Sequence, residues 1–225
     1  MLCPVGHEQV GVSARLYEAA GAPLAWLVLA PGAGASHDST FIVTFARALA
    51  SRGLHVVTFN FPYLERGRRV PDTNVILEKC WDAVLRAVRE KAGAASPLFA
   101  GGKSMGGRIA SQVAARPDLT VRLKGLLLLG YPLHPPGRPD QRRTAHWPRL
   151  RLPALFIQGS RDPFGTPEEL RAALAGFGGD SRVMIVDGGD HSFKVPRSAG
   201  RPQDAVHAEI QDAIVAWIRD AREGG

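Results

Sequence analysis

The stretch Leu98–Ala110, which reads LFAGGKSMGGRIA, has two incompatible interpretations. Gly102-Lys103-Ser104 looks like the end of a phosphate-binding loop, in which lysine and serine bind a nucleotide and its magnesium ion. The five residues from Gly102 to Gly106 also fit the pattern G-x-S-x-G, a turn that presents a nucleophilic serine. The first interpretation predicts an NTPase, and the second predicts a serine hydrolase.

The phosphate-binding loop fails on its spacing. The pattern G-x-x-x-x-G-K-[ST] requires a glycine five residues before Gly102, where the sequence has Pro97. The segment Pro97–Gly101 is also predicted to be a strand, which leaves no residues for the backbone loop that surrounds phosphates. We therefore reject a nucleotide site at this position and expect no dependence on ATP.

The nucleophile turn fits its surroundings. A predicted strand leads directly into a predicted helix, and Ser104 lies at the sharp bend between them. Side chains two residues to either side of the bend would collide with the neighbouring strand and helix. Gly102 and Gly106 remove those side chains, and Gly107 gives more room. Ser104 is therefore the candidate nucleophile.

A serine nucleophile needs a base, and the base needs an acid that orients it. In folds with this turn, the acid and then the histidine follow the serine along the chain, each just after a later strand. Asp162 follows one predicted strand and His191 follows the next. We predict a triad of Ser104, Asp162 and His191. Asp187 remains a rival for the acid, and Asp190 is a weaker rival because its backbone position next to His191 directs it elsewhere.

The negative charge that develops on the substrate oxygen needs two preorganised donors. The backbone N–H of Met105 is predicted to be one, and that of Ala33, in the loop PGAGASHDS, the other. Gly32 and Gly34 allow this loop to approach a ligand closely. A dinucleotide-binding pattern G-x-G-x-x-G is incomplete here, because His37 stands where the third glycine belongs.

Short apolar runs alternate with longer segments of helical period along the chain. This alternation predicts an α/β fold, a three-layer sandwich with a mainly parallel sheet whose strands are buried on both faces. A further strand or two is expected near Gln9–Tyr17. The main predicted strands are Leu24–Ala30, Leu54–Asn60, Pro97–Gly101, Gly125–Gly130, Pro153–Gln158 and Arg182–Asp187.

The bulk composition describes an ordinary globular protein. The chain has 225 residues with 45% hydrophobic content, and we expect residues 1–225 to form a single domain. No apolar run is long enough to span a bilayer, and the first residues do not read as a secretion signal. Cys3 and Cys80 are the only cysteines, which suits a reducing cytoplasm.

The formal net charge of +7 comes mostly from arginine. Basic residues do not alternate with aromatic residues in a stripe, so we expect a solvated basic surface and no nucleic-acid partner. No spacing of cysteine, histidine and carboxylate residues predicts a metal site. We therefore expect no metal and no cofactor, and the pattern leaves the oligomeric state open.

Taken together, the motifs PGAGAS, FNFPY, GGKSMGGR, GYPLHPPG, QGSRDPFG and GDHSFK resemble the α/β-hydrolase superfamily. They are most similar to its small, lid-poor, dienelactone-hydrolase-like members, and among these to an uncharacterised subgroup that includes a subunit of an animal chromatin-acetylating complex. The resemblance runs from about Leu24 to the terminal helix and implies the triad already derived. Pro31-Gly32 replaces the histidine-glycine of many hydrolases. Serine replaces the cysteine of true dienelactone hydrolases, so their substrate is not carried over.

Further residues are predicted at the cleft. Gly32, Gly34, His37, Tyr63 and His134 are candidates for contact with the substrate, whereas Lys103 is expected to form an ion pair or lie at the surface. Only about twenty residues follow the strand Gly125–Gly130 before the next strand, which is too few for a helical lid. Two segments are expected to border an open cleft and to attract an anionic substrate through Arg66, Arg68, Arg69, Arg142 and Arg143.

The sequence thus predicts a cytoplasmic serine hydrolase that cleaves small acyl esters or thioesters through an acyl-enzyme. The alternative is a protein-interaction module without catalysis on the same scaffold, because a fold alone does not establish activity.

Overall fold

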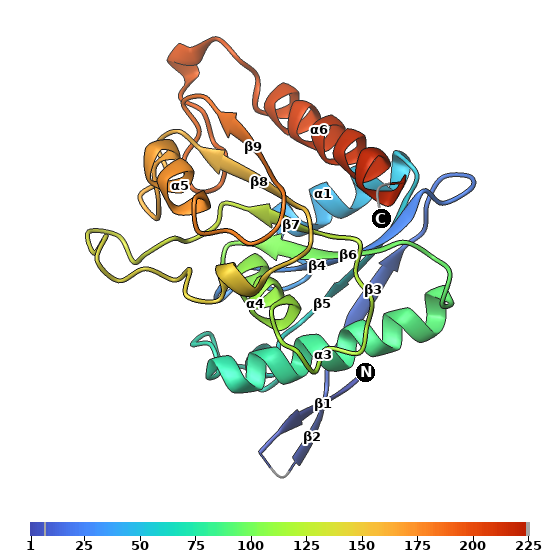
Figure 1. The fold of residues 1–225 in the computed structure, drawn as a ribbon. Helices are drawn as coiled ribbons and strands as arrows, with labels where there is room; N and C mark the ends of the chain where they lie inside the picture. Colours follow the sequence, from blue (N-terminus) through green and yellow to red (C-terminus); the bar gives the residue numbers. More distant parts are fainter. Residues whose placement is uncertain (7, 224–225) are drawn as a thin grey trace.

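The computed structural model describes residues 1–6 and 8–223. Its centre is a seven-stranded sheet in the order β3-β5-β4-β6-β7-β8-β9 (Figure 1). All neighbouring pairs are parallel except β3 with β5. The strands are β3 (Ala14–Tyr17), β4 (Ala25–Ala30), β5 (Leu54–Phe59), β6 (Leu98–Lys103), β7 (Gly125–Leu129), β8 (Ala154–Gly159) and β9 (Ser181–Val186).

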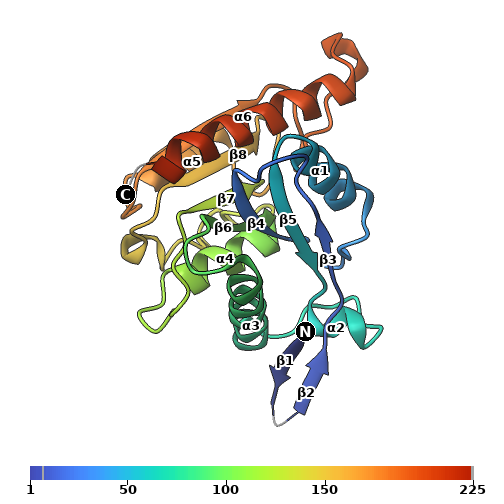
Figure 2. The same cartoon turned by 90° about the vertical axis from the view of Figure 1, so that its right-hand side faces the viewer.

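The six main predicted strands are all present, with ends that differ by one or two residues. The largest difference is at β6, which continues past the expected Gly101 to Lys103 because Lys103 still pairs with Leu129 of β7. The segment Gln9–Tyr17 contains two strands, of which only β3 joins the main sheet. The other, β2 (Glu8–Gly11), pairs with β1 (Leu2–Val5) in a separate antiparallel hairpin (Figure 2).

Helices cover both faces of the sheet, which confirms the predicted three-layer sandwich. Apolar residues of α1 (Thr40–Ser51) and α6 (Gln203–Glu223) form a core against one face. Residues of α3 (Asn74–Ala92), α4 (Met105–Ala114) and α5 (Pro167–Leu174) form a second core against the other. Figures 1 and 2 show these layers from two directions. A short helix, α2 (Pro62–Glu65), follows β5.

Helix α5 begins with local signals that are visible in the sequence. The Thr166 hydroxyl accepts from the Glu169 N–H at 3.2 Å, and the Glu169 carboxylate accepts from the Thr166 N–H at 2.9 Å. Pro167, which lacks an N–H, occupies the first helical position. This capping box sets the start of the helix, and therefore the end of the loop that carries Asp162.

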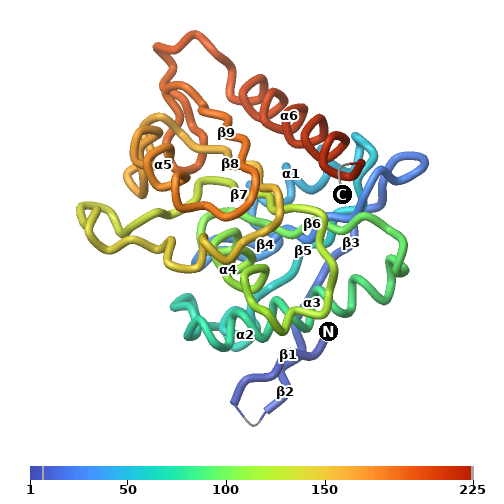
Figure 3. Tube along the Cα trace, in the orientation of Figure 1, coloured from blue at the N-terminus to red at the C-terminus, as the bar shows by residue number. Residues whose placement is uncertain are grey.

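The segment between β7 and β8 contains only one short 3₁₀ turn, Trp147–Arg149. Figure 3 shows it as a loop that extends from the body of the protein. As expected, the described residues include no helical lid over the carboxyl ends of the strands. In the same part of the chain, none of the helices has the length and apolar character needed to cross a membrane.

Candidate active site

Ser104 lies between β6 and α4 in a conformation that side chains rarely adopt. Its φ of 50° and ψ of −117° place a single strained residue between the end of the strand and the first residue of the helix. The Ser104 N–H still bonds to Leu129 O of β7 at 2.9 Å, and Ser104 O already accepts from the Arg108 N–H of α4 at 3.0 Å. The bend therefore projects the hydroxyl from the sheet edge, as the G-x-S-x-G pattern predicts.

The two glycines of the pattern are required by close backbone packing. A Cβ at Gly102 would lie 2.4 Å from Ala30 O, and one at Gly106 would lie 2.6 Å from the carbonyl oxygens of Ala30 and Pro31. Real Cβ atoms do not come so close to backbone atoms, so a side chain at Gly102 would push β4 away from β6, and one at Gly106 would push the start of α4 away from the end of β4. The neighbouring strand for which the sequence predicted a collision is therefore β4, which pairs directly with β6.

The structure brings Ser104, His191 and Asp162 together from three separate strand ends. His191 Nε2 lies 2.9 Å from Ser104 Oγ, and His191 Nδ1 lies 2.7 Å from Asp162 Oδ2. Asp162 follows β8 and His191 follows β9, so both reach the edge where β6 ends. The Phe164 ring packs against the imidazole with its centroid 4.3 Å away and helps to orient it.

The Asp162 carboxylate is fully buried and is held by three donors. Oδ1 accepts from the Phe164 N–H at 2.9 Å. Oδ2 accepts from Gln158 Nε2 at 2.9 Å and faces His191 Nδ1. Gln158, in β8, was missed by the sequence reasoning. The signal was a polar residue at the end of an otherwise apolar strand, four residues before the acid.

Neither rival acid contacts His191. Oδ1 of Asp190 accepts from the N–H groups of Ser192 and Lys194, at 2.7 and 2.9 Å, and so shapes the turn that carries the histidine. Asp187 is exposed, and its nearest polar partner is Ser160 Oγ at 3.5 Å. Geometry therefore leaves Asp162 as the acid beside His191.

The two predicted oxyanion donors have free amide groups. Within the described residues, neither the Met105 N–H nor the Ala33 N–H donates a hydrogen bond, and both residues line the cleft at Ser104. The Gly34 N–H, by contrast, donates to Tyr63 Oη at 3.0 Å and is already used. Met105 is also the first residue of α4, where the helix dipole favours negative charge.

A family comparison matches this chain over residues 23–219 to a model described as an alpha/beta hydrolase domain. The chain belongs to the alpha/beta hydrolase family. The match includes the nucleophile turn and both strand ends that carry Asp162 and His191.

Solved structures share the fold of this alpha/beta hydrolase along nearly its whole length. One is an alpha-beta serine hydrolase homologue from Coxiella burnetii, with a TM-score of 0.73 and 20% identity over 96% of this chain and 95% of that one. A dienelactone hydrolase from Anabaena variabilis has the same score and identity over 96% and 94%. A serine hydrolase without a lid from Xanthomonas campestris has a TM-score of 0.68 and 18% identity over 96% and 93%.

In this alpha/beta hydrolase, three predicted substrate contacts lie elsewhere. Tyr63 is fully buried, with its hydroxyl behind the oxyanion loop. His37 is buried, and its backbone N–H donates to Asn60 Oδ1 at 2.8 Å. His134 is buried with Nε2 at 3.2 Å from Glu169. None of the three is among the residues that line the cleft at Ser104.

Of the two glycines in the loop after β4, one lines the cleft and the other does not. Gly32 lines the cleft, where an added Cβ would lie 3.6 Å from Ser104 Cβ. Gly34 is not among the lining residues. Its φ of 72° makes the turn that directs its N–H back to Tyr63, so its role is to shape the loop.

Lys103 departs most from expectation, because it neither forms an ion pair nor lies at the surface. Its side chain is buried, and Nζ has no hydrogen-bond partner among the described residues. The ammonium lies 5.9 Å from the centroid of Phe41 and 5.7 Å from that of Phe193. Burial lowers the pKa of Lys103 to about 8, while the charges of Asp162 and Asp190 act in the opposite direction.

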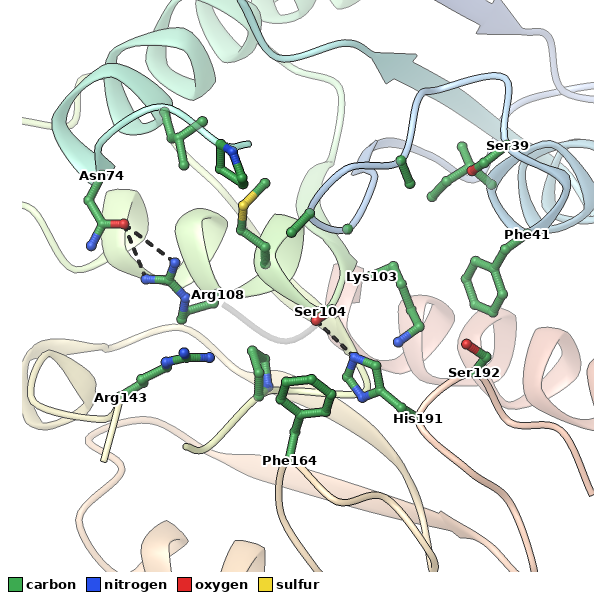
Figure 4. A pocket seen from close by; sticks show the side chains of 18 of the residues that line it. Ser39, Phe41, Asn74, Lys103, Ser104, Arg108, Arg143, Phe164, His191 and Ser192 are labelled. Carbon is green, nitrogen blue, oxygen red and sulfur yellow. Dashed lines mark hydrogen bonds between the residues drawn. The ribbon is translucent and has the colours of Figure 1, made fainter. Parts of the chain in front are cut away.

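The cleft at Ser104 has a volume of about 560 Å³ and is open to solvent. Figure 4 shows side chains that line it. Of the five arginines expected around it, only Arg143 lines it. Arg108, one turn after the nucleophile, also lines it and was not predicted. Its other lining residues include Ser39, Phe41, Ile42, Pro71, Asp72, Asn74, Leu77, Pro132, Phe164 and Ser192. No group of three potential metal ligands is assembled within residues 1–6 and 8–223.

Proposed function

We propose that this alpha/beta hydrolase cleaves small acyl esters or thioesters through an acyl-enzyme. The observation that carries the proposal is the unbroken chain of contacts Ser104 Oγ, His191 Nε2, His191 Nδ1 and Asp162 Oδ2, at 2.9 and 2.7 Å. An oriented histidine within hydrogen-bond distance of a serine is the arrangement that activates a hydroxyl as a nucleophile.

Each residue then has a role in the reaction. Ser104 Oγ attacks the ester carbonyl while His191 Nε2 removes its proton, and Asp162 stabilises the charged imidazole that results. The Met105 and Ala33 amides hold the oxyanion. His191 returns the proton to the leaving alcohol or thiol as the carbon–oxygen or carbon–sulfur bond breaks. A water, deprotonated by the same histidine, then releases the acid and restores Ser104.

The decisive experiment is labelling with a fluorophosphonate, which captures an activated serine by losing fluoride. We expect one adduct, mapped by mass spectrometry to Ser104, and its loss in Ser104→Ala and His191→Ala. Ser192→Ala is the matched control, because Ser192 lines the same cleft and that variant should keep the label. Labelling at a different serine, or strong labelling without His191, would contradict the proposed triad.

The open cleft also predicts a preference for short acyl chains. A fully buried methylene contributes about 0.8 kcal/mol, or roughly fourfold in kcat/KM, but an open cleft cannot bury a long chain. We expect kcat/KM to level off beyond the first few carbons in a series of phenyl esters from acetyl to dodecanoyl. A steady increase with chain length would show that a buried acyl tunnel exists.

An interaction module without catalysis remains the alternative function. The resemblance to the subgroup that includes a chromatin-complex subunit suggests it, and membership of that subgroup remains a prediction. The contacts among Ser104, His191 and Asp162 favour the enzyme, because a binding module does not require them. We propose a small acyl compound as the partner and the cytoplasm as the setting, in keeping with the free thiols of Cys3 and Cys80.

A further inference from the structure

Two arginines line the cleft on one side of Ser104. Figure 4 shows Asn74, Arg108 and Arg143 together on one side of Ser104, with Lys103 on the other. We call the group of Asn74, Arg108 and Arg143 the arginine arm. Its residues come from the start of α3, from α4 and from the loop after β7.

Arg108 is held in the arm by neutral groups. Its Nη1 donates to Gln112 Oε1 at 3.1 Å, and both terminal nitrogens approach Asn74 Oδ1 at 3.4 Å. Its Nε is buried and has no partner within the described residues. The same residues contain no carboxylate at ion-pair distance from this guanidinium group. The charge is therefore held in place without an ion-pair partner, although the charge of Glu78 acts on it from farther away.

The groups beneath Arg108 do not supply the missing negative charge. The Ser111 hydroxyl, which donates to Arg108 O, lies 2.7 Å from His146 Nε2. Burial, and then the charges of Arg108 and Arg149, lower the pKa of His146 to about 4, so this histidine is neutral at pH 7. Burial raises the pKa of Tyr131 to about 12. The side chains of Ser111, His146 and Tyr131 beneath the arginine arm are thus uncharged at neutral pH.

Arg143 adds a second guanidinium group that also has no ion-pair partner in the described part of the chain. Its backbone is fixed, because its N–H donates to Leu133 O and its carbonyl accepts from Tyr131 Oη, both at 2.8 Å. In the described part of the chain, its guanidinium group forms no hydrogen bond or ion pair. Burial lowers the pKa of Arg108, Tyr131 opposes the shift, the charge of Arg143 lowers the pKa further, and the charge of Glu78 raises it. The two guanidinium groups therefore repel each other on this side of the cleft.

Several arginines elsewhere in the described part of the chain are paired with carboxylates, whereas the two that line the cleft are not. Arg52 pairs with Asp212 at 2.7 Å, for example. Asp72, the acidic residue that lines the cleft, pairs with Arg68 through Oδ1, and its Oδ2 has no partner among the described residues. Two like charges without an ion-pair partner destabilise a cleft unless a ligand supplies the negative charge. The start of α3 at Asn74 adds the positive end of a helix dipole to the same place.

We propose that the arginine arm binds a carboxylate group of the ester substrate while Ser104 attacks the ester carbonyl of the same molecule. Paired guanidinium groups match the planar oxygens of a carboxylate. The substrate class is then the half-ester of a dicarboxylic acid, or the ester of a carboxylate-bearing alcohol. This inference rests on the proposed function and specifies its substrate.

The test compares matched anionic and neutral esters in kcat/KM. Monophenyl adipate and its amide, phenyl 5-carbamoylpentanoate, place the charge on the acyl side. The pair 4-carboxyphenyl acetate and 4-carbamoylphenyl acetate places it on the leaving group. We expect the anionic member of one pair to be preferred by about 10-fold to 100-fold at low salt, the range for charge-assisted hydrogen bonds. The pair that shows the preference identifies the side that carries the carboxylate.

Arginine variants connect that preference to the arm. Arg143→Gln and Arg108→Gln should each reduce the anionic-to-neutral ratio at least about fivefold, and Arg108→Lys should lie between, because it keeps the charge but loses the planar fork. Arg142→Gln is the matched control. It removes the adjacent arginine, which lies 3.8 Å from Glu169 and is not among the cleft's lining residues, and it should leave the ratio unchanged. A wild-type ratio near one for both pairs, or one that no arm variant changes, overturns the inference.

A binding measurement separates this inference from the proposed function. Ser104→Ala cannot form an acyl-enzyme but keeps both arginines, so adipate should bind to it in a calorimetric titration and fail to bind to Ser104→Ala/Arg143→Gln. Adipate binding without fluorophosphonate labelling of the wild type would remove the hydrolase proposal and keep the anion site. Labelling at Ser104 without adipate binding or anionic preference would keep the hydrolase and remove the site.

Discussion

Replacing Asp162 with asparagine is expected to lower kcat by about 10⁴, the size of effect seen when the orienting acid of a serine protease is replaced by its amide. The variant keeps the shape of the side chain, so the protein should fold. The loss should appear in kcat rather than in KM, because Asp162 does not line the cleft and acts through His191. The measurement is steady-state hydrolysis of a phenyl ester.

The hydrogen-bond pattern explains why an amide cannot replace this carboxylate. Oδ1 accepts from the Phe164 N–H, whereas Oδ2 accepts from Gln158 Nε2 and faces His191 Nδ1. An amide offers only one oxygen, so its NH₂ must face at least one of these donors. If the NH₂ faces His191, Nδ1 becomes the acceptor and Nε2 carries the proton, and the histidine then cannot accept the proton of Ser104.

Asp187→Asn is the matched control for this experiment. Asp187 is exposed and has no contact with His191, so its variant should retain wild-type kcat. A decrease of less than tenfold in Asp162→Asn, together with a large decrease in Asp187→Asn, would mean that the histidine uses the other acid during the reaction.

Replacing Lys103 with methionine is expected to stabilise the protein by up to about 3 kcal/mol at pH 7. Burial lowers the pKa of Lys103 from the usual 10.5 to about 8, and a tenfold change in proton affinity corresponds to about 1.4 kcal/mol. Methionine has a similar length and can occupy the space beside Phe41 and Phe193 without a charge. Urea denaturation of both proteins measures the difference in the free energy of unfolding.

The stabilisation should depend on pH in a defined direction. Below pH 8 Lys103 is protonated in both the folded and the unfolded chain, so the full cost of burying the charge is present. Between pH 8 and pH 10.5 the unfolded chain binds more protons than the folded one, so wild-type stability rises with pH. The advantage of Lys103→Met should therefore shrink to less than about 1 kcal/mol at pH 10.

Lys79→Met serves as the control, because Lys79 is exposed on α3, and it should change stability by less than about 0.5 kcal/mol at both pH values. A Lys103→Met protein that is less stable than the wild type at pH 7 would show that the ammonium has a favourable partner. A buried cation that lowers stability beside a nucleophile is a feature of functional sites rather than of folding cores.

Much of the architecture follows from short segments of sequence. The apolar runs form buried parallel strands because they lack the alternation of a half-exposed strand. The G-x-S-x-G pattern predicts the nucleophile turn because only glycine fits against β4 at Gly102 and Gly106. The order of strands along the chain also places Asp162 and His191 at the edge where Ser104 lies, since parallel strands all end on the same side of the sheet.

The contacts between distant segments could not be predicted in this way. The one or two strands predicted near Gln9–Tyr17 divide between two sheets, because β2 pairs with β1 and β3 pairs with β5. Asp187 and Asp162 were both possible acids, and the path of the loop after β8 decides between them. Gln158 could not be assigned until its amide was seen beside the Asp162 carboxylate.

By itself, then, the sequence determined the strands, the turn at Ser104 and the strand ends at which the predicted Asp162 and His191 lie, because these depend on backbone geometry and on residues close together in the chain. Only the tertiary structure decided which side chains reach the cleft. Tyr63, His37 and His134 are covered by neighbouring loops, Lys103 is enclosed by aromatic rings from α1 and the loop after β9, and Arg108 faces Arg143 from another segment. Burial and charge at these positions are set by elements far away in sequence, so no local pattern records them.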